Sequence, residues 1–123
     1  MIPIVDLTPV TLKCARVSAD DATPTAVDVS AYDGDAICVV AVTPVSGTTP
    51  TCDIKLQQFT AATGAFTDIT GAAITQVAEV ASLTKIQLKI GELSKYLRAP
   101  IDVGGTSPVY DIAIILLAQL KYS

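Results

Sequence analysis

The chain has 123 residues, of which 50% are hydrophobic and 16% are charged, and eight Lys and Arg against twelve Asp and Glu give a formal net charge of −4. A chain of this length forms one domain and buries about two thirds of its unfolded surface, enough for a core without metal or disulfide. High hydrophobicity with low net charge excludes a disordered chain, and the acidic balance excludes a general nucleic-acid binder.

Three residue types are missing from the sequence, which has no His, no Trp and no Asn. Without His, the usual general base and the commonest transition-metal ligand are both lacking, so we expect no metal and no other cofactor. The N-terminus has no basic, apolar signal-peptide pattern. The most apolar stretch, residues 112–118, is far shorter than a membrane span and is typical of a buried strand. We expect no membrane partner.

The three cysteines, Cys14, Cys38 and Cys52, are too far apart in the sequence for a compact zinc site. Two interpretations stay open. All three can be free, buried thiols, because free Cys is among the most often buried residue types. In an oxidising compartment, one internal disulfide would leave the third cysteine able to bridge two subunits.

The first element along the chain is an extended N-terminal arm, residues 1–9, which precedes a domain of residues 10–123. Pro3 and Pro9 favour an extended chain that cannot be a central strand. Either the arm binds a groove or sheet edge of a neighbouring subunit, or it folds onto its own domain as a strand. Its candidate interface residues are Ile2, Pro3, Ile4 and Val5.

The next elements are strands separated by loops. Residues 7–17 alternate in part, with Val10, Leu12 and Cys14 expected on one side, and a second strand is expected at residues 26–29. Residues 32–35 have the composition of a turn. The continuous apolar run 36–42 predicts a central strand that is covered on both faces.

The second half of the chain shows the same pattern. Residues 43–50 are expected to be a long hairpin loop. The expected strands that follow are 52–58, 66–69, 85–90, 96–103 and 109–120. Gly104, Gly105 and Pro108 predict a hairpin that pairs residues 96–103 with 109–120.

Short strands at this spacing predict an all-β fold, a single antiparallel β-sandwich of jelly-roll or immunoglobulin type. The expected core residues are Ile37, Val39, Ile54, Leu56, Ile86, Leu88, Ile112, Ile114 and Leu116, although a fully apolar run does not reveal which of its faces is buried.

Candidate catalytic patterns are weak. Ser82 and Lys85 match the S-x-x-K spacing of serine acylases without the partner motifs or the two-domain cleft of those enzymes. Asp33 and Asp35 lack the loop order of a calcium site. We therefore expect no enzymatic activity.

Arg98 is the most unusual charged residue, because it lies in an otherwise apolar strand. It can pair with a carboxylate of its own chain, remain solvated, or reach across an interface, where the planar guanidinium binds carboxylates at two points.

A resemblance to known proteins rests on four segments: Phe66-Thr67-Asp68-Ile69-Thr70-Gly71-Ala72, Lys95-Tyr96-Leu97-Arg98-Ala99, Val103-Gly104-Gly105-Thr106-Ser107-Pro108 and Gln119-Leu120-Lys121-Tyr122. Over residues 36–122 the chain resembles small structural proteins of tailed bacteriophages, although Phe66 stands where the common pattern tends to have Trp.

The resemblance implies a capsid decoration (cement) protein, made in the bacterial cytoplasm and located on the capsid surface of the virion. Its partners would be the phage major capsid protein and further copies of itself, as a homo-trimer. The alternative is a tail or neck component, or a β-sandwich module that binds the host surface.

Overall fold

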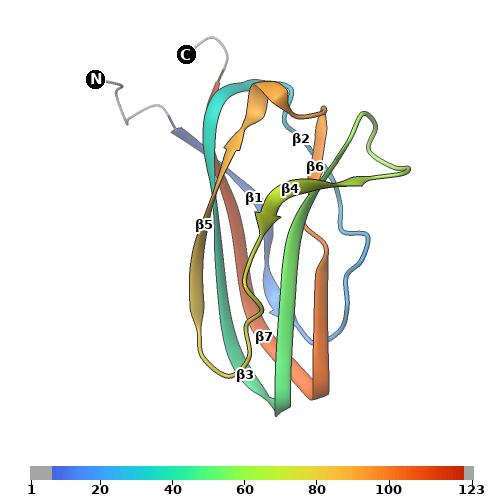
Figure 1. The fold of residues 1–123 in the computed structure, drawn as a ribbon, viewed down its shortest axis with the longest axis vertical. Coiled ribbons are helices and arrows are strands. Elements are labelled where there is room, and N and C mark those ends of the chain that lie inside the picture. Colours follow the sequence, from blue (N-terminus) through green and yellow to red (C-terminus); the bar gives the residue numbers. More distant parts are fainter. Residues whose placement is uncertain (1–6, 121–123) are drawn as a thin grey trace.

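The computed structural model describes residues 7–120 and consists almost entirely of antiparallel strands (Figure 1). The elements are β1 (Leu7–Val17), β2 (Val27–Asp28), β3 (Tyr32–Phe59), β4 (Thr67–Ala73), β5 (Ser82–Lys89), the short 3-10 helix η2 (Ile90–Glu92), β6 (Tyr96–Arg98) and β7 (Ile101–Leu120). The predicted all-β, sandwich-like class is confirmed.

Two long strands organise the fold. β3 and β7 pair with each other from Tyr32 with Leu120 to Ile54 with Ile101, and this two-stranded ribbon turns back on itself at the lower end of the molecule (Figure 1). The curled sheet therefore forms two facing layers. Layer A has the order β5-β3-β7-β1 and contains the first half of β3 and the second half of β7. Layer B contains the second half of β3, with β4 on one side. On the other side lie the first residues of β7 and then β6, which also pairs with β2.

The sequence predicted two hairpin loops at the corner of the ribbon. This prediction is wrong, because the strands continue through both segments. Residues 43–50 belong to β3 and residues 104–108 belong to β7, and the two segments face each other, for example where Thr48 pairs with Thr106. The pairing register shifts three times between Pro44 and Thr51. Gly and Pro residues mark both hairpins and β-bulges, and here they bend continuous strands.

Glycine is required at the corner because the two strands approach closely. Gly105 has a φ of +99°, and a Cβ at this position would lie 2.5 Å from the Thr49 carbonyl oxygen. A Cβ at Gly47, with φ +122°, would lie 2.9 Å from the Pro108 Cα atom. Neither position accepts a side chain without backbone movement.

The core lies between the two layers. Layer A contributes Cys38, Val40, Val42, Ile112, Ile114 and Leu116, and layer B contributes Ile54, Leu56, Leu97 and Ile101. The predicted core is confirmed for seven of the nine residues, Ile54, Leu56, Ile86, Leu88, Ile112, Ile114 and Leu116. It is wrong for Ile37 and Val39, which are only half-buried, because β3 turns Cys38 and Val40 inward instead. The described residues cover one face of this run, not both.

The core contains one buried tyrosine. Tyr110 is 0% exposed, and its hydroxyl group donates to the carbonyl oxygens of Ala78, at 2.9 Å, and Val77, at 3.2 Å. Val77 also pairs with Cys52 through two backbone hydrogen bonds. Together with the bonds from the Tyr110 hydroxyl group, they hold the segment between β4 and β5 against the core.

The strand predicted at residues 7–17 is confirmed as β1, which pairs with β7 from Leu7 to Val17. Residues 7–9, which the expected arm of residues 1–9 also included, belong to this strand, and the arm residues Ile2, Pro3, Ile4 and Val5 lie outside the described residues. Pro9 is tolerated because β1 is the edge strand of layer A. A register shift between Thr11 and Lys13 also places Val10 and Cys14 on opposite faces, not on one side.

Smaller differences occur at two turns. Residues 32–35 begin β3 instead of forming a turn, with an irregular register up to Ile37. The expected strand 85–90 begins earlier, at Ser82, and ends at Lys89 where η2 begins.

Candidate interaction surface

The two outer faces of the sandwich differ in chemistry. An antiparallel sheet with one face on the core normally shows polar side chains on the other. The outer face of layer B follows this rule, whereas the outer face of layer A does not. We call these surfaces face B and face A.

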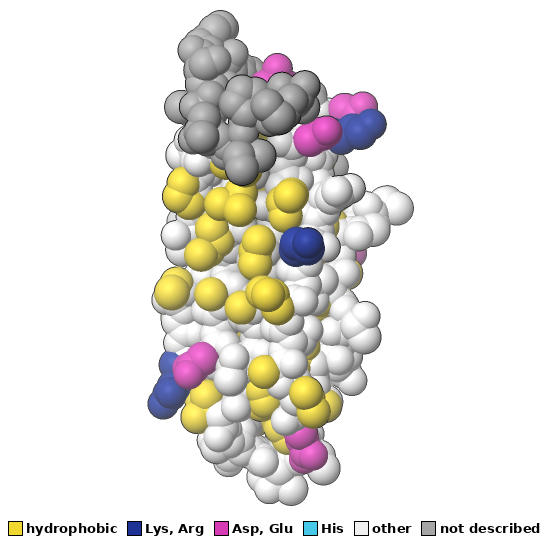
Figure 2. Space-filling view, turned by 90° about the vertical axis from the view of Figure 1, so that its left-hand side faces the viewer, with side chains coloured by type: hydrophobic (Ala, Val, Ile, Leu, Met, Phe, Trp, Pro, Cys, Tyr) yellow, Lys and Arg dark blue, Asp and Glu magenta, His cyan; other side chains and the backbone are white. Residues whose placement is uncertain are grey.

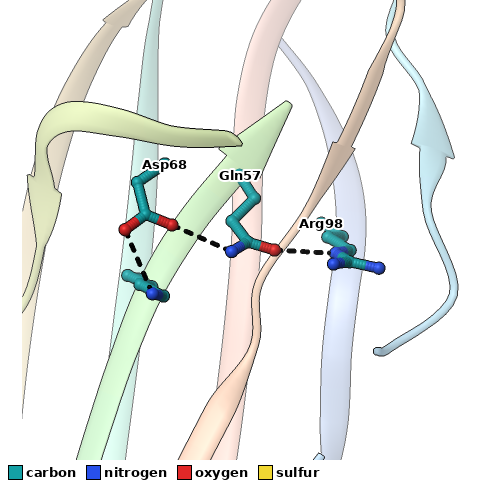
Figure 3. A network of polar contacts seen from close by, with 4 residues as sticks. Gln57, Asp68 and Arg98 are labelled. Atoms are coloured by element: carbon teal, nitrogen blue, oxygen red, sulfur yellow. Dashed lines mark hydrogen bonds and ion pairs between the residues drawn. The ribbon is translucent and has the colours of Figure 1, made fainter. Parts of the chain in front are cut away.

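Face B has a network of polar contacts that joins three strands (Figure 3). Arg98 on β6 donates from Nε to Oε1 of Gln57 on β3, at 2.9 Å, and Gln57 donates from Nε2 to Oδ1 of Asp68 on β4, at 2.8 Å. Lys55 on β3 completes the network with an ion pair to Asp68 Oδ2 at 3.1 Å. The bond from Gln57 and the ammonium group of Lys55 lower the pKa of Asp68.

Arg98 therefore has an intrachain partner, which is an amide and not a carboxylate. Its guanidinium group also lies over the ring of Phe66, 4.0 Å from the centroid, in a cation–π arrangement. Among residues 7–120 no carboxylate is within ion-pairing distance of Arg98. These contacts anchor β6 and the start of β4 to β3, so they give Arg98 a role within the fold.

A second part of face B is acidic. Asp20, Asp53 and Asp102 line a shallow depression together with Pro100 and Lys55. The negative charge of Asp20 and a hydrogen bond with it raise the pKa of Asp102. Across the described part of the chain, no group of three or more acidic or Cys side chains is arranged to hold a metal ion.

Face A has an apolar centre. Cross-strand neighbours Ile37 and Leu117, Val39 and Ile115, and Ala41 and Ala113 form three rows of outward-facing side chains on β3 and β7. All six side chains are half-buried. Figure 2 shows hydrophobic side chains gathered over this face, with charged groups near its two ends and one basic side chain beside them about halfway along.

The two edge strands extend the apolar centre of face A. β5 adds Leu83, which is 72% exposed and lies beside Ala41, and β1 adds Pro9 beside Leu117 and Cys14 beside Ala113. Lys85 and Gln87 alternate with the inward-facing residues of β5 and form a polar margin on that side.

The ends of face A are polar or hollow. At the corner end, Arg16 and Asp111 form an exposed two-point ion pair with N–O distances of 2.8 and 3.1 Å. At the other end a shallow depression is lined by Leu7, Ile37, Leu117 and Lys89, among others. Another depression, around Cys14, Ala41 and Ala113, lies nearer the corner.

The three cysteines are free, as the first interpretation of the sequence had them, but only two are buried. Burial raises the pKa of the Cys38 thiol to about 12 and that of the Cys52 thiol to about 11. Cys14 is exposed on face A, because the irregularity in β1 turns it outward. The face thus contains the one exposed thiol of the protein.

The interface residues predicted from the sequence lie elsewhere. Arg98 is on face B, and Ile2, Pro3, Ile4 and Val5 are outside the described part of the chain. Ile37, Val39, Ile115 and Leu117 were not predicted to be surface residues. The sequence does indicate an apolar outer face, because residues 36–42 and 112–118 are apolar on both sides of each strand. We interpreted this pattern as burial on both faces.

Comparisons with known proteins identify no relative: no family model matches the chain, and no curated protein matches it. The single helical element within residues 7–120 has three residues, so no described helix has the length or hydrophobicity to cross a membrane.

Proposed function

We propose that this chain is a structural protein of a tailed-phage virion, which decorates the capsid and stabilises it by binding across neighbouring major capsid subunits. The protein would be made in the bacterial cytoplasm and would end on the capsid surface. Its role in this proposal is assembly, without catalysis.

The observation that favours an assembly role is the apolar centre of face A. Contiguous apolar surface that is rimmed by polar residues is typical of interaction sites. The contrast with face B strengthens the argument, because Gln57, Asp68 and Arg98 show that the same sandwich has a conventional polar exterior on its other side.

The phage assignment rests on the sequence resemblance. A protein that binds only the assembled shell stabilises that shell by mass action, in proportion to its affinity and concentration. For this purpose a rigid sandwich and an interaction surface are sufficient. The arm residues Ile2, Pro3, Ile4 and Val5 are our candidates for the contact with the shell.

The test uses virions of the phage whose genome encodes the chain. Antibodies against the purified protein, bound to virions and imaged by electron microscopy, should label the head. Label confined to the tail or neck would support the alternative of a tail or neck component or host-binding module, and virions without any label would refute a structural role.

The shell contact has its own test, the deletion of residues 1–6. If the arm binds the shell, the deleted protein melts at an unchanged temperature but no longer binds expanded capsids. A large drop in melting temperature would instead mean that this segment is part of the domain's own core.

A further inference from the structure

We propose that face A is the interface between two copies of this chain, which pack sheet against sheet about a two-fold axis. The inference concerns the isolated protein, replaces the homo-trimer that the resemblance implies by a dimer, and does not depend on the identity of the larger assembly.

The composition of face A is closer to that of a homodimer contact than to that of a contact with an unrelated partner. Its centre, formed by Ile37, Val39, Ala41, Ala113, Ile115 and Leu117, has no charged or hydrogen-bonding side chain. Transient interfaces are about as polar as the rest of a protein surface, whereas homodimer interfaces are more apolar and have few charges at their centre.

The shape of face A favours a second copy in particular. Two β-sheets pack face to face when they have the same handed twist, with their strands within about 30° of each other. A sheet surface is therefore complementary to a copy of itself. A two-fold axis makes the same patch serve both partners, which closes the assembly at two and leaves no free apolar face for further growth.

The size of face A is sufficient for a specific but modest dimer. Four strands about 4.8 Å apart and nine residues at about 3.3 Å each give a footprint of about 19 by 30 Å, or roughly 570 Å² per copy. Two copies then bury roughly 1,100 Å², which lies just above the lower limit of specific interfaces. We expect dissociation in the micromolar range, not the nanomolar range.

The polar margin restricts the direction of the axis. With an axis parallel to the strands and between β3 and β7, β5 of one copy lies over β1 of the other. Lys85 then faces the uncharged outer side of β1, where Thr11 and Cys14 lie. An axis perpendicular to the strands would stack β5 on β5 and bring Lys85 close to its own copy, which like-charge repulsion disfavours.

The matched variants are Ala41→Glu and Ala73→Glu. Ala41 lies in the centre of face A, whereas Ala73 is exposed on face B beside Lys55. Both substitutions add one carboxylate to a strand and remove no existing contact, so the two variants have the same net charge. Only Ala41→Glu places two carboxylates within the proposed apolar interface.

The first measurement is the mass in solution, by sedimentation equilibrium from about 1 µM to about 1 mM, a range that includes micromolar dissociation. The unmodified chain and Ala73→Glu should change from monomer to dimer over this range. Ala41→Glu should dissociate at least about 100-fold more readily, because like charges would meet in an apolar interface.

The second measurement uses Cys14 as a reporter, because it lies on face A and the other two thiols are buried. Its reaction rate with Ellman's reagent should fall with protein concentration, about ten-fold when about nine tenths of the chains are paired. The rate in Ala41→Glu should stay constant.

Several results would overturn the inference. A monomer at every concentration refutes it, and so does a trimer, because three copies cannot pair face to face about a two-fold axis. A dimer with an unchanged Cys14 rate, or one lost in Ala73→Glu, would place the contact elsewhere. A monomer whose Cys14 is protected only by capsids would assign face A to the shell, which would overturn the self-pairing and leave the proposed function intact.

Discussion

Replacing Gly105 by alanine should destabilise the protein through the corner of the β3/β7 ribbon. The matched control is Gly71→Ala. Both glycines have positive φ angles, +99° at Gly105 and +77° at Gly71, so an alanine is conformationally strained at either position. They differ in their surroundings, because nothing lies within 4 Å of a Cβ built on Gly71, whereas a Cβ on Gly105 meets the backbone of residues 48–50.

The expected magnitudes follow from this difference. An L-residue at positive φ costs about 1–2 kcal/mol, and the loss of glycine's freedom in the unfolded chain returns about 0.4–1 kcal/mol. Gly71→Ala should therefore lower the free energy of unfolding by at most about 1.6 kcal/mol. Gly105→Ala adds a clash at 2.5–2.9 Å with backbone atoms of Thr48, Thr49 and Pro50, which relaxes only if the paired strands separate, at a further cost of about 1–3 kcal/mol.

Urea denaturation, followed by far-ultraviolet circular dichroism, measures both variants. With a denaturant dependence of about 2 kcal/mol per molar urea, an additional 2 kcal/mol corresponds to a midpoint about 1 M lower for Gly105→Ala than for Gly71→Ala. Equal midpoints would show that the strands at the corner move apart without cost. The close approach of β3 and β7 would then not be what requires glycine at position 105.

Two further predictions concern single polar groups. Tyr110→Phe should lower the free energy of unfolding by about 1 kcal/mol, because it removes the hydroxyl donor to the Ala78 carbonyl, and thermal unfolding should show no such loss for Tyr96→Phe, whose hydroxyl has no hydrogen bond within residues 7–120. Asp102→Asn should raise the melting temperature at pH 7 and leave it unchanged at pH 2. The pKa of Asp102 is raised by Asp20, so its contribution to stability is present when it is protonated and is lost as pH rises through that pKa; a variant that is more stable only in acid would contradict this sign.

The sequence was sufficient for the parts of the fold where polarity alternates. In β5, Ile86 and Leu88 alternate with Lys85, Gln87 and Lys89. The apolar pair therefore had to face the core, and the structure buries it. In residues 36–42 and 112–118 the side chains on both sides of the strand are apolar, so the sequence does not reveal which side faces the core. Cys38 faces inward because layer B lies on that side. The corner was unpredictable for a similar reason, since Gly105 and its neighbours fit a hairpin as well as a bend.

The candidate surface shows the same limit of sequence reasoning. Arg98 was recognisable as unusual, but its partner Gln57 is 41 residues away and is brought to it only by the pairing of β3 with β6. Ile37, Val39 and Ile115 are residue types that are usually found in the core. They lie at the surface because no element within residues 7–120 covers the outer side of layer A.

The long β3/β7 ribbon also has a consequence for how quickly the protein folds. Its paired residues are separated by 47 positions, for Ile54 with Ile101, up to 88, for Tyr32 with Leu120, and no short turn joins the two strands. Closing such loops costs chain entropy before any ladder hydrogen bond forms, and domains dominated by distant pairings fold in milliseconds to seconds. Newly made chains should therefore expose the apolar side chains of β3 and β7 for longer than a chain built from local hairpins would. Aggregation of the unfolded chains should then depend strongly on the rate of synthesis.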